Sequence, residues 1–248
     1  MGTAIEQMKS APLEERGSVY TKPTVVEFML DRAGYSVEKE LWRSRVLEPS
    51  FGGGDFLFSI VRRLLKSARR DGREWSSLTG AILAVELHEA TFLATRERLL
   101  SVLAEEGLPA RQAQTLAEAW LGNGDFLLHS IAGGFDFIAG NPPSVRQELL
   151  PAVLLAEYRR CFATLYDRAD LYVPFMERCL QLLLPGGRLS FICSDRWMKN
   201  RYGGPLRDMI TRDYSLRYYV DMVGTDAFQS DVVAYPAITV IERGLRKG

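Results

Sequence analysis

The chain has 248 residues, of which 47% are hydrophobic and 25% are charged, a composition that excludes intrinsic disorder and collagen-like repeats. Its 31 basic residues balance 31 acidic ones, so the molecule as a whole does not attract polyanions, and a nucleic-acid surface must be a local patch or belong to a partner. The cysteines Cys161, Cys179 and Cys193 have neither disulfide-framework nor zinc-site spacing. No apolar run resembles a signal peptide or reaches the ~20 residues that span a bilayer. We expect a cytoplasmic protein that binds neither membrane nor metal.

Apolar runs of strand length alternate with longer amphipathic stretches, a pattern typical of βα units on a mostly parallel sheet. We expect helices at residues 24–33, 54–70, 89–105, 107–119, 170–184 and 205–212, and strands at residues 45–47, 81–86, 135–139, 188–193, 216–220 and 237–242. No convincing helix separates the last two strands, which predicts a closing hairpin with one antiparallel strand. A single α/β domain without repeats or long linkers is therefore expected.

Two acidic residues close two of the predicted strands. Glu48 begins a glycine-rich turn, Pro49-Ser50-Phe51-Gly52-Gly53-Gly54, in which the missing Cβ atoms let backbone N–H groups approach a ligand. Glu86 ends the next strand, where nucleoside-binding sheets place an acid that accepts hydrogen bonds from both ribose hydroxyls. Taken alone, the glycine segment could instead be a tight turn without a ligand, and Glu86 could be an exposed carboxylate at a strand end.

Two further segments carry polar groups at strand ends. Asp125-Phe126 offers an acid followed by an aromatic ring, suited to binding adenine, although a polar loop explains it equally well in isolation. In Asn141-Pro142-Pro143-Ser144 the prolines stiffen the backbone and remove two donors. The Asn141 oxygen and a backbone carbonyl then suit an amino group with two N–H donors. The alternative is that Asn-Pro-Pro, taken alone, forms only a turn.

Taken in order, five motifs resemble those of the adenine-N6 DNA methyltransferases of the gamma arrangement, in particular the methylase portions of fused type II, Eco57I-like restriction-modification enzymes. The motifs are Tyr20-Thr21-Lys22-Pro23, Glu48 to Phe56, Val85-Glu86, Asp125-Phe126 and Asn141-Pro142-Pro143. The resemblance implies a Rossmann-like methyltransferase fold with a mostly parallel seven-stranded sheet and one antiparallel strand near the C-terminus. This domain would span residues 18–248, after an N-terminal extension at 1–17.

The resemblance also implies the cofactor S-adenosylmethionine. Tyr20 and Thr21 would line its methionine end above the glycine turn, Glu86 would hold the ribose, and Asp125 with Phe126 would bind the adenine. The implied cofactor-binding residues are Tyr20, Thr21, Glu48, Pro49, Phe51, Gly52, Gly54, Phe56, Glu86, Leu87, Asp125, Phe126 and Asn141.

Catalysis would fall to Asn141, Pro142, Pro143 and Ser144. Asn141 and the Pro142 carbonyl would accept the amino protons of an adenine turned out of the DNA duplex, aiming its lone pair at the methyl group. The family normally has an aromatic residue where this chain has Ser144, which lacks a π-face worth about 1–3 kcal/mol in stacking. Ser144 is a natural adaptation, a sign of lost activity or a deliberate change.

A compensating ring would stack on the base. Phe228, before the closing strand, is our first candidate and joins Ser144 as a predicted base-binding residue, with Trp197 second. The alternative is that both rings belong to the core. His88 and His129 show no sequence pattern for metal binding or nucleophilic catalysis, and we interpret both as structural.

Residues 196–217 form a basic stretch, which would contact DNA phosphates or form a solvated charged face. Its cations are Arg196, Lys199, Arg201, Arg207, Arg212 and Arg217, around a predicted mobile loop at Tyr202-Gly203-Gly204. The family's target-recognition domain has no counterpart in this sequence, so we expect another domain or a specificity subunit to supply it. Two alternatives stay open: a catalytically silent cofactor-binding subunit, and a methyltransferase acting on RNA or on a protein amide.

Overall fold

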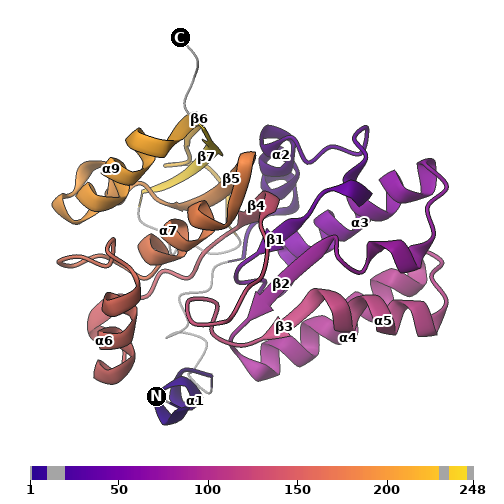
Figure 1. Ribbon diagram of the computed structural model, residues 1–248, viewed down its shortest axis with the longest axis horizontal. Helices are drawn as coiled ribbons and strands as arrows, with labels where there is room; N and C mark the ends of the chain where they lie inside the picture. Colours follow the sequence, from indigo (N-terminus) through magenta and orange to yellow (C-terminus); the bar gives the residue numbers. More distant parts are fainter. Residues whose placement is uncertain (1, 10–19, 229–234, 245–248) are drawn as a thin grey trace.

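The computed structural model describes residues 2–9, 20–228 and 235–244 (Figure 1). Seven strands form one sheet in the order β3-β2-β1-β4-β5-β7-β6. Strand β7 pairs antiparallel with β5 and β6, and the other pairs are parallel, which confirms the predicted fold class and closing hairpin. The strands are β1 Val46–Glu48, β2 Ile82–Glu86, β3 Leu121–Asn123, β4 Phe135–Gly140, β5 Leu183–Ser194, β6 Tyr214–Asp221 and β7 Pro236–Arg243.

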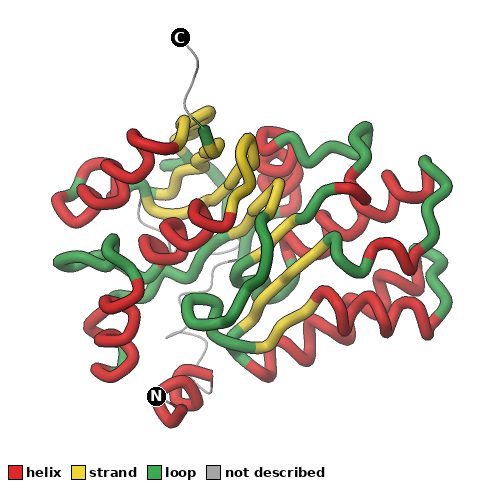
Figure 2. Tube along the Cα trace, in the orientation of Figure 1, coloured by secondary structure: helices red, strands yellow, loops and turns green. Residues whose placement is uncertain are grey.

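Helices pack against both faces of this sheet, as the tube in Figure 2 shows. Helices α2 to α5 contribute to one hydrophobic cluster, and α6 to α9 contribute to a second cluster on the opposite face. The helices are α1 Gly2–Lys9, α2 Pro23–Ala33, α3 Asp55–Arg70, α4 Glu89–Glu105, α5 Ala110–Trp120, α6 Ala152–Cys161, α7 Tyr172–Leu182, α8 Arg196–Lys199 and α9 Gly204–Asp213.

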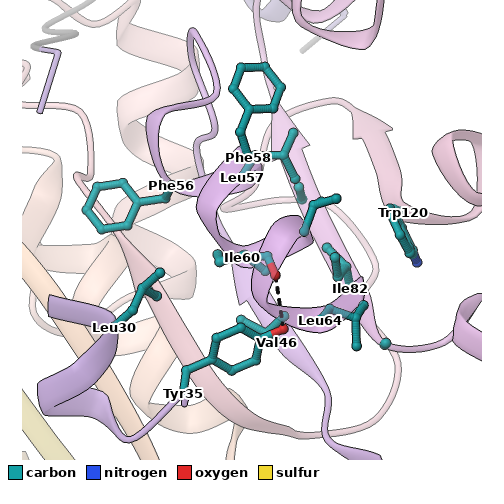
Figure 3. Close-up of a cluster of buried hydrophobic side chains, with 14 of the residues drawn as sticks. Leu30, Tyr35, Val46, Phe56, Leu57, Phe58, Ile60, Leu64, Ile82 and Trp120 are labelled. Carbon is teal, nitrogen blue, oxygen red and sulfur yellow. Dashed lines mark hydrogen bonds between the residues drawn. The ribbon is translucent and has the colours of Figure 1, made fainter. Parts of the chain in front are cut away.

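Alternation along the strands produces the two clusters. Val46 of β1 belongs to the first cluster and Leu47 to the second, because successive side chains of a strand point to opposite faces. Figure 3 shows part of the first cluster, including Leu30, Val46 and Ile60. Burial of Tyr35 in this cluster raises the pKa of its phenol, whose OH donates a 3.4 Å hydrogen bond to the Ile60 carbonyl. Both faces of the sheet are therefore packed, as a parallel sheet requires.

Several predicted boundaries were wrong. Strand β5 begins at Leu183, ahead of the expected residue 188, because Leu183 already pairs with Phe135, and helix α7 therefore ends at Leu182. Strand β3 and the helices α1, α6 and α8 were not predicted. The mobile loop expected at residues 202–204 is instead part of a 3-10 helix, Arg201–Gly203, that leads directly into α9. Within it, Gly203 packs against the Trp197 carbonyl.

The sheet topology determines where a ligand site can form. The order of the parallel strands reverses between β1 and β4, and in open α/β sheets such a switch point leaves a crevice at the carboxyl ends of the strands. Glu48 ends β1, Glu86 ends β2, and Asn141 directly follows β4. These three predicted site residues are therefore brought to one edge. No helix in the described ranges is long and apolar enough to cross a membrane.

Candidate active site

Two adjoining pockets, each with about 570 Å³ of empty space including the part open to solvent, form a cleft at this edge of the sheet. They share Ser50, Glu86, His88 and Pro143, so one elongated ligand can occupy both. The first pocket is further lined by Tyr20, Thr21, Glu48, Phe51, Gly52, Gly53, Asp55, Phe56, Thr91 and Asn141. The second is further lined by Met8, Pro49, Leu87, Gly124, Asp125, Phe126, Val145, Tyr158, Leu171 and Phe175.

The turn that lines the first pocket depends on its glycines, for reasons of backbone angle or of space. Gly52 and Gly54 have φ values of 49° and 90°, in the left-handed region that favours glycine. A Cβ atom on Gly53 would lie 2.6 Å from Cε1 of Tyr20. The Gly52 N–H donates a 2.9 Å hydrogen bond to Oε2 of Glu86, which ties the turn to the end of β2. A ligand can thus approach the backbone closely.

Three carboxylates surround this first pocket. Glu48 is 1% exposed, and its Oε2 has no hydrogen-bond partner among the described residues. Burial, reinforced by the neighbouring charges of Asp55 and Glu86, raises its pKa well above the usual 4.5. Asp55 accepts a 2.7 Å hydrogen bond from the Thr21 N–H, while burial raises its pKa. A cationic group entering this pocket would satisfy the Glu48 oxygen.

Glu86 stands at the junction of the two pockets. Its Oε1 accepts a 2.8 Å hydrogen bond from the His88 N–H and its Oε2 accepts the one from Gly52. Each carboxylate oxygen has a second lone pair, so the group retains the capacity to accept two hydroxyl donors. The backbone bonds therefore orient the carboxylate without saturating it.

The second pocket is an apolar slot with a polar end. Phe126 and Phe175 lie 5.1 Å apart between ring centroids. Asp125 accepts hydrogen bonds from the Leu127 N–H at 2.9 Å and from the Tyr158 hydroxyl at 2.6 Å, and burial raises its pKa despite both bonds. A flat aromatic ring with a polar edge suits this slot.

The predicted catalytic motif lies above the first pocket. The Asn141 amide donates to Oγ1 of Thr21 at 3.4 Å, which joins the end of β4 to the segment before α2. Pro142 is buried, whereas Pro143 lines both pockets. Gly140 packs close to Pro49, so that the motif and the glycine turn lie together: a Cβ on Gly140 would lie 3.5 Å from Cδ of Pro49.

Other predicted residues lie outside the two linings. Ser144 is exposed, and Gly54 lies behind the turn against the Phe58 ring. Phe228 forms an isolated antiparallel bridge with Thr21 but packs against the first core cluster. Trp197 is buried in the second cluster, as its alternative interpretation stated. The base-binding role of Ser144 and Phe228 stays a prediction.

Sequence reasoning missed several lining residues. His88, which we expected to be purely structural, lines both pockets. Asp55 lies within the motif from Glu48 to Phe56, directly after the glycines, so its position could have identified it. Tyr158, Phe175 and Met8 come from helices distant in the sequence, and no local pattern links them to the cleft.

The basic stretch is largely engaged in contacts within the protein. Lys199 pairs with Asp195 at 2.5 Å, and Arg217 forms an ion pair with Glu242. Arg207 donates hydrogen bonds to the carbonyls of Trp197 and Asn200 at 2.6 and 2.8 Å. For these cations the structure favours a structural role. No group of three potential ligand residues among the described residues could hold a metal ion.

Comparison with known proteins gives two kinds of likeness. The chain is 56% identical over 234 residues to the type II methyltransferase M.PaeR7I of Pseudomonas aeruginosa, and the match covers 93% of this chain but 41% of the relative. Its fold resembles a putative class I S-adenosylmethionine-dependent methyltransferase of Listeria monocytogenes (TM-score 0.62, 15% identity, 98% of this chain, 65% of that chain). It also resembles the DrdV protein in a DrdV–DNA complex (TM-score 0.67, 16% identity, 93% of this chain, 27% of that chain).

The chain therefore has the S-adenosylmethionine-dependent methyltransferase fold, and it spans about two fifths of the length of its curated relative. The family model of the Eco57I restriction-modification methylase matches residues 83–228, more than half of the sequence. This match includes Glu86, Asp125 and the Asn141-Pro142-Pro143 motif. On this ground the chain belongs to the Eco57I restriction-modification methylase family.

Proposed function

We propose that this chain is the catalytic domain of a DNA methyltransferase that transfers a methyl group from S-adenosylmethionine to N6 of adenine. It would act in the cytoplasm within a restriction-modification or phage-defence system. The observation that carries the proposal is the position of the Asn141-Pro142-Pro143 motif at the end of β4, directly over a pocket with an acidic wall.

The cleft fits the proposed cofactor at both ends. Glu48 has a buried oxygen without a described partner, which would accept the ammonium group of the methionine moiety. Glu86 would accept hydrogen bonds from the two ribose hydroxyls, and the adenine would lie in the slot lined by Phe126 and Phe175, with Asp125 at its polar edge. When bound, S-adenosylmethionine supplies an electrophilic methyl group.

The chain's own groups would then align the acceptor. An adenine amino nitrogen is a weak nucleophile because its lone pair is delocalised into the ring. Acceptors at Asn141 Oδ1 and the Pro142 carbonyl would hold the two N–H groups and favour the pyramidal nitrogen, whose lone pair is localised. The target base would have to leave the duplex to reach this position.

DNA is the proposed substrate because of the relatives. M.PaeR7I is a type II methyltransferase, and the DrdV structure is a complex with DNA. Since the chain spans 41% of M.PaeR7I, we propose that a target-recognition domain or a specificity subunit beyond this sequence selects the DNA site.

A catalytically silent cofactor-binding subunit is the second candidate. Ser144 favours it, because this residue is exposed and lacks the ring that would stack on an extruded base. Methyl transfer to RNA or to a protein amide would use the same acceptor geometry, since each substrate presents a planar amino group.

The deciding experiment is transfer of tritiated methyl groups from S-adenosylmethionine to unmethylated DNA and, in parallel reactions, to RNA, followed by digestion to nucleosides. We expect label in N6-methyladenine, lost with Asn141→Ala, and a rate roughly ten- to a hundredfold higher with Ser144→Tyr, which restores a stacking ring. Label in cytosine, or in RNA rather than DNA, would contradict the proposal. Cofactor binding without transfer, by the wild-type chain and by Ser144→Tyr alike, would favour the silent subunit.

A further inference from the structure

The N-terminal helix α1 packs against the wall of the second pocket. Ile5 and Met8 share one face of this helix at a spacing of three residues, and both are half-buried against the second core cluster. Helix α1 lies beside α6 (Figure 1). An isolated helix of eight residues is unstable in water, so these tertiary contacts hold it in place.

A hydrogen bond ties the end of α1 to the cleft. The Lys9 carbonyl lies 3.2 Å from Nδ1 of His88, and because a carbonyl oxygen only accepts, the ring nitrogen donates. The backbone N–H of His88 in turn donates to Oε1 of Glu86. Helix α1 is thus fastened to the residue that joins the two pockets.

Met8 completes the apolar slot. It lines the second pocket together with Phe126, Val145 and Phe175, which come from much later in the chain. An unbranched thioether adapts to the shape of a ring and makes favourable contacts between sulfur and aromatic groups. A flat ring in the slot would therefore meet a flexible apolar contact from α1.

We propose that Met8 contacts the adenine ring of the bound cofactor and that α1 covers this end of the cleft, slowing release of the cofactor. The inference rests on the proposed function, because it takes S-adenosylmethionine as the ligand. It extends the cofactor-binding site into the segment that the sequence assigned to an extension outside the methyltransferase domain.

The test compares Met8→Ala with Leu93→Ala, which truncates an exposed apolar side chain of α4 outside both pockets. Stopped-flow or surface-plasmon measurements would give association and dissociation rates of S-adenosylhomocysteine. We expect Met8→Ala to raise the dissociation rate about five- to tenfold, as the loss of a buried apolar contact implies, and Leu93→Ala to leave it unchanged. The association rate should change little, because the contact forms after the adenine has entered.

Hydrogen–deuterium exchange adds a readout that general destabilisation would not reproduce. We expect S-adenosylhomocysteine to slow amide exchange in residues 2–9 of the wild-type chain. A Met8→Ala dissociation rate within about twofold of wild type, or unchanged exchange in α1, would overturn the inference. If the wild-type chain binds neither S-adenosylmethionine nor its demethylated product, the proposed function itself fails.

Discussion

The environment of Glu48 is unlike that of an exposed carboxylate. Glu48 is buried at the end of β1, lacks a described partner for Oε2 and lies near the charges of Asp55 and Glu86. A buried anion without a counterion is costly, which is why burial raises the pKa of this carboxyl group. A ligand ammonium would supply the missing countercharge, as expected if this acid binds the ligand at a cost in stability.

Replacing Glu48 should therefore raise the stability of the protein while lowering its affinity for the cofactor. Since the pKa of Glu48 is higher in the folded than in the unfolded chain, the folded chain binds the extra proton, and stability falls as pH rises from about 4.5 through the raised pKa. Glu48→Gln removes this proton linkage. The free energy of unfolding of the variant should exceed that of the wild type by an amount that grows by up to about 1.4 kcal/mol per pH unit.

The measurement is urea unfolding of both proteins at several pH values from about 4.5 to 7.5. Parallel stability curves would contradict the raised pKa. Glu48→Gln should also lower the affinity for S-adenosylmethionine by about ten- to a hundredfold, because it removes a charged hydrogen bond of about 1.5–3 kcal/mol. Methylthioadenosine, which lacks the amino-acid end, is the control ligand and should bind both proteins equally.

Three of the predicted pocket residues share one property, because each lies where a buried strand ends. Glu48, Glu86 and Asn141 are adjacent to apolar runs, and the carboxyl ends of parallel strands meet at one edge. Tyr158 and Phe175 could not be predicted, because they reach the cleft through the packing of α6 and α7. Their contacts with Asp125 and Phe126 depend on tertiary structure and leave no local pattern.

At the scale of elements, the connection from α8 to α9 shows how one glycine can determine a fold segment. Gly203 has φ −78°, a value open to any residue, so its backbone angle does not require glycine. Space does, because a Cβ there would lie 1.8 Å from the Trp197 carbonyl oxygen. The close approach makes this segment compact, where the pair Gly203-Gly204 had suggested a mobile loop.

Gly203→Ala and Gly204→Ala form a matched pair for this interpretation. Gly203→Ala should lower the free energy of unfolding by about 2–4 kcal/mol, because backbone must shift to admit the methyl group. At Gly204 the nearest atom to an added Cβ is Arg207 Nη2 at 3.9 Å and φ is −50°, so Gly204→Ala should be neutral or stabilising by about 0.4–1 kcal/mol. Chemical denaturation of both variants checks the pair, and equal effects would contradict the steric explanation.

Strands with long apolar runs could be predicted from the sequence, whereas short strands that depend on pairing with a neighbour could not. The apolar runs of β2, β4 and β7 were recognisable because their residues are buried on both faces. Strand β3 has three residues, of which two are Gly122 and Asn123, and it exists because β2 offers a free edge. Helix α6 escaped notice because few of its residues are buried, Leu154 and Tyr158 among them.

At the scale of the whole molecule, the cleft connects the two halves of the core. The first pocket draws on the segment before α2, the glycine turn and α3, whose apolar residues belong to the first cluster. The second pocket is walled by Phe126, Tyr158 and Phe175 of the second cluster. The alternation of apolar runs and amphipathic stretches predicted a mostly parallel sheet, whereas the cleft between the two clusters depends on side chains from each.

A ligand that spans this cleft should stabilise the molecule as a unit. At a concentration about a hundredfold above its dissociation constant, S-adenosylmethionine should add about 2.7 kcal/mol to the free energy of unfolding. For a chain of this size such a gain corresponds to a rise of about 5–10 °C in Tm. S-adenosylhomocysteine should act alike, because it retains both ends of the cofactor.

ATP is the control ligand for thermal unfolding, since it carries the same adenosine but places a triphosphate where the cofactor carries an ammonium group. Glu48, Asp55 and Glu86 would oppose these negative charges in the first pocket, so ATP at the same concentration should leave Tm within about 1 °C. Differential scanning calorimetry measures both shifts. An equal rise with ATP would mean that the second pocket alone determines affinity, and the acidic wall would then have no part in recognising the cofactor.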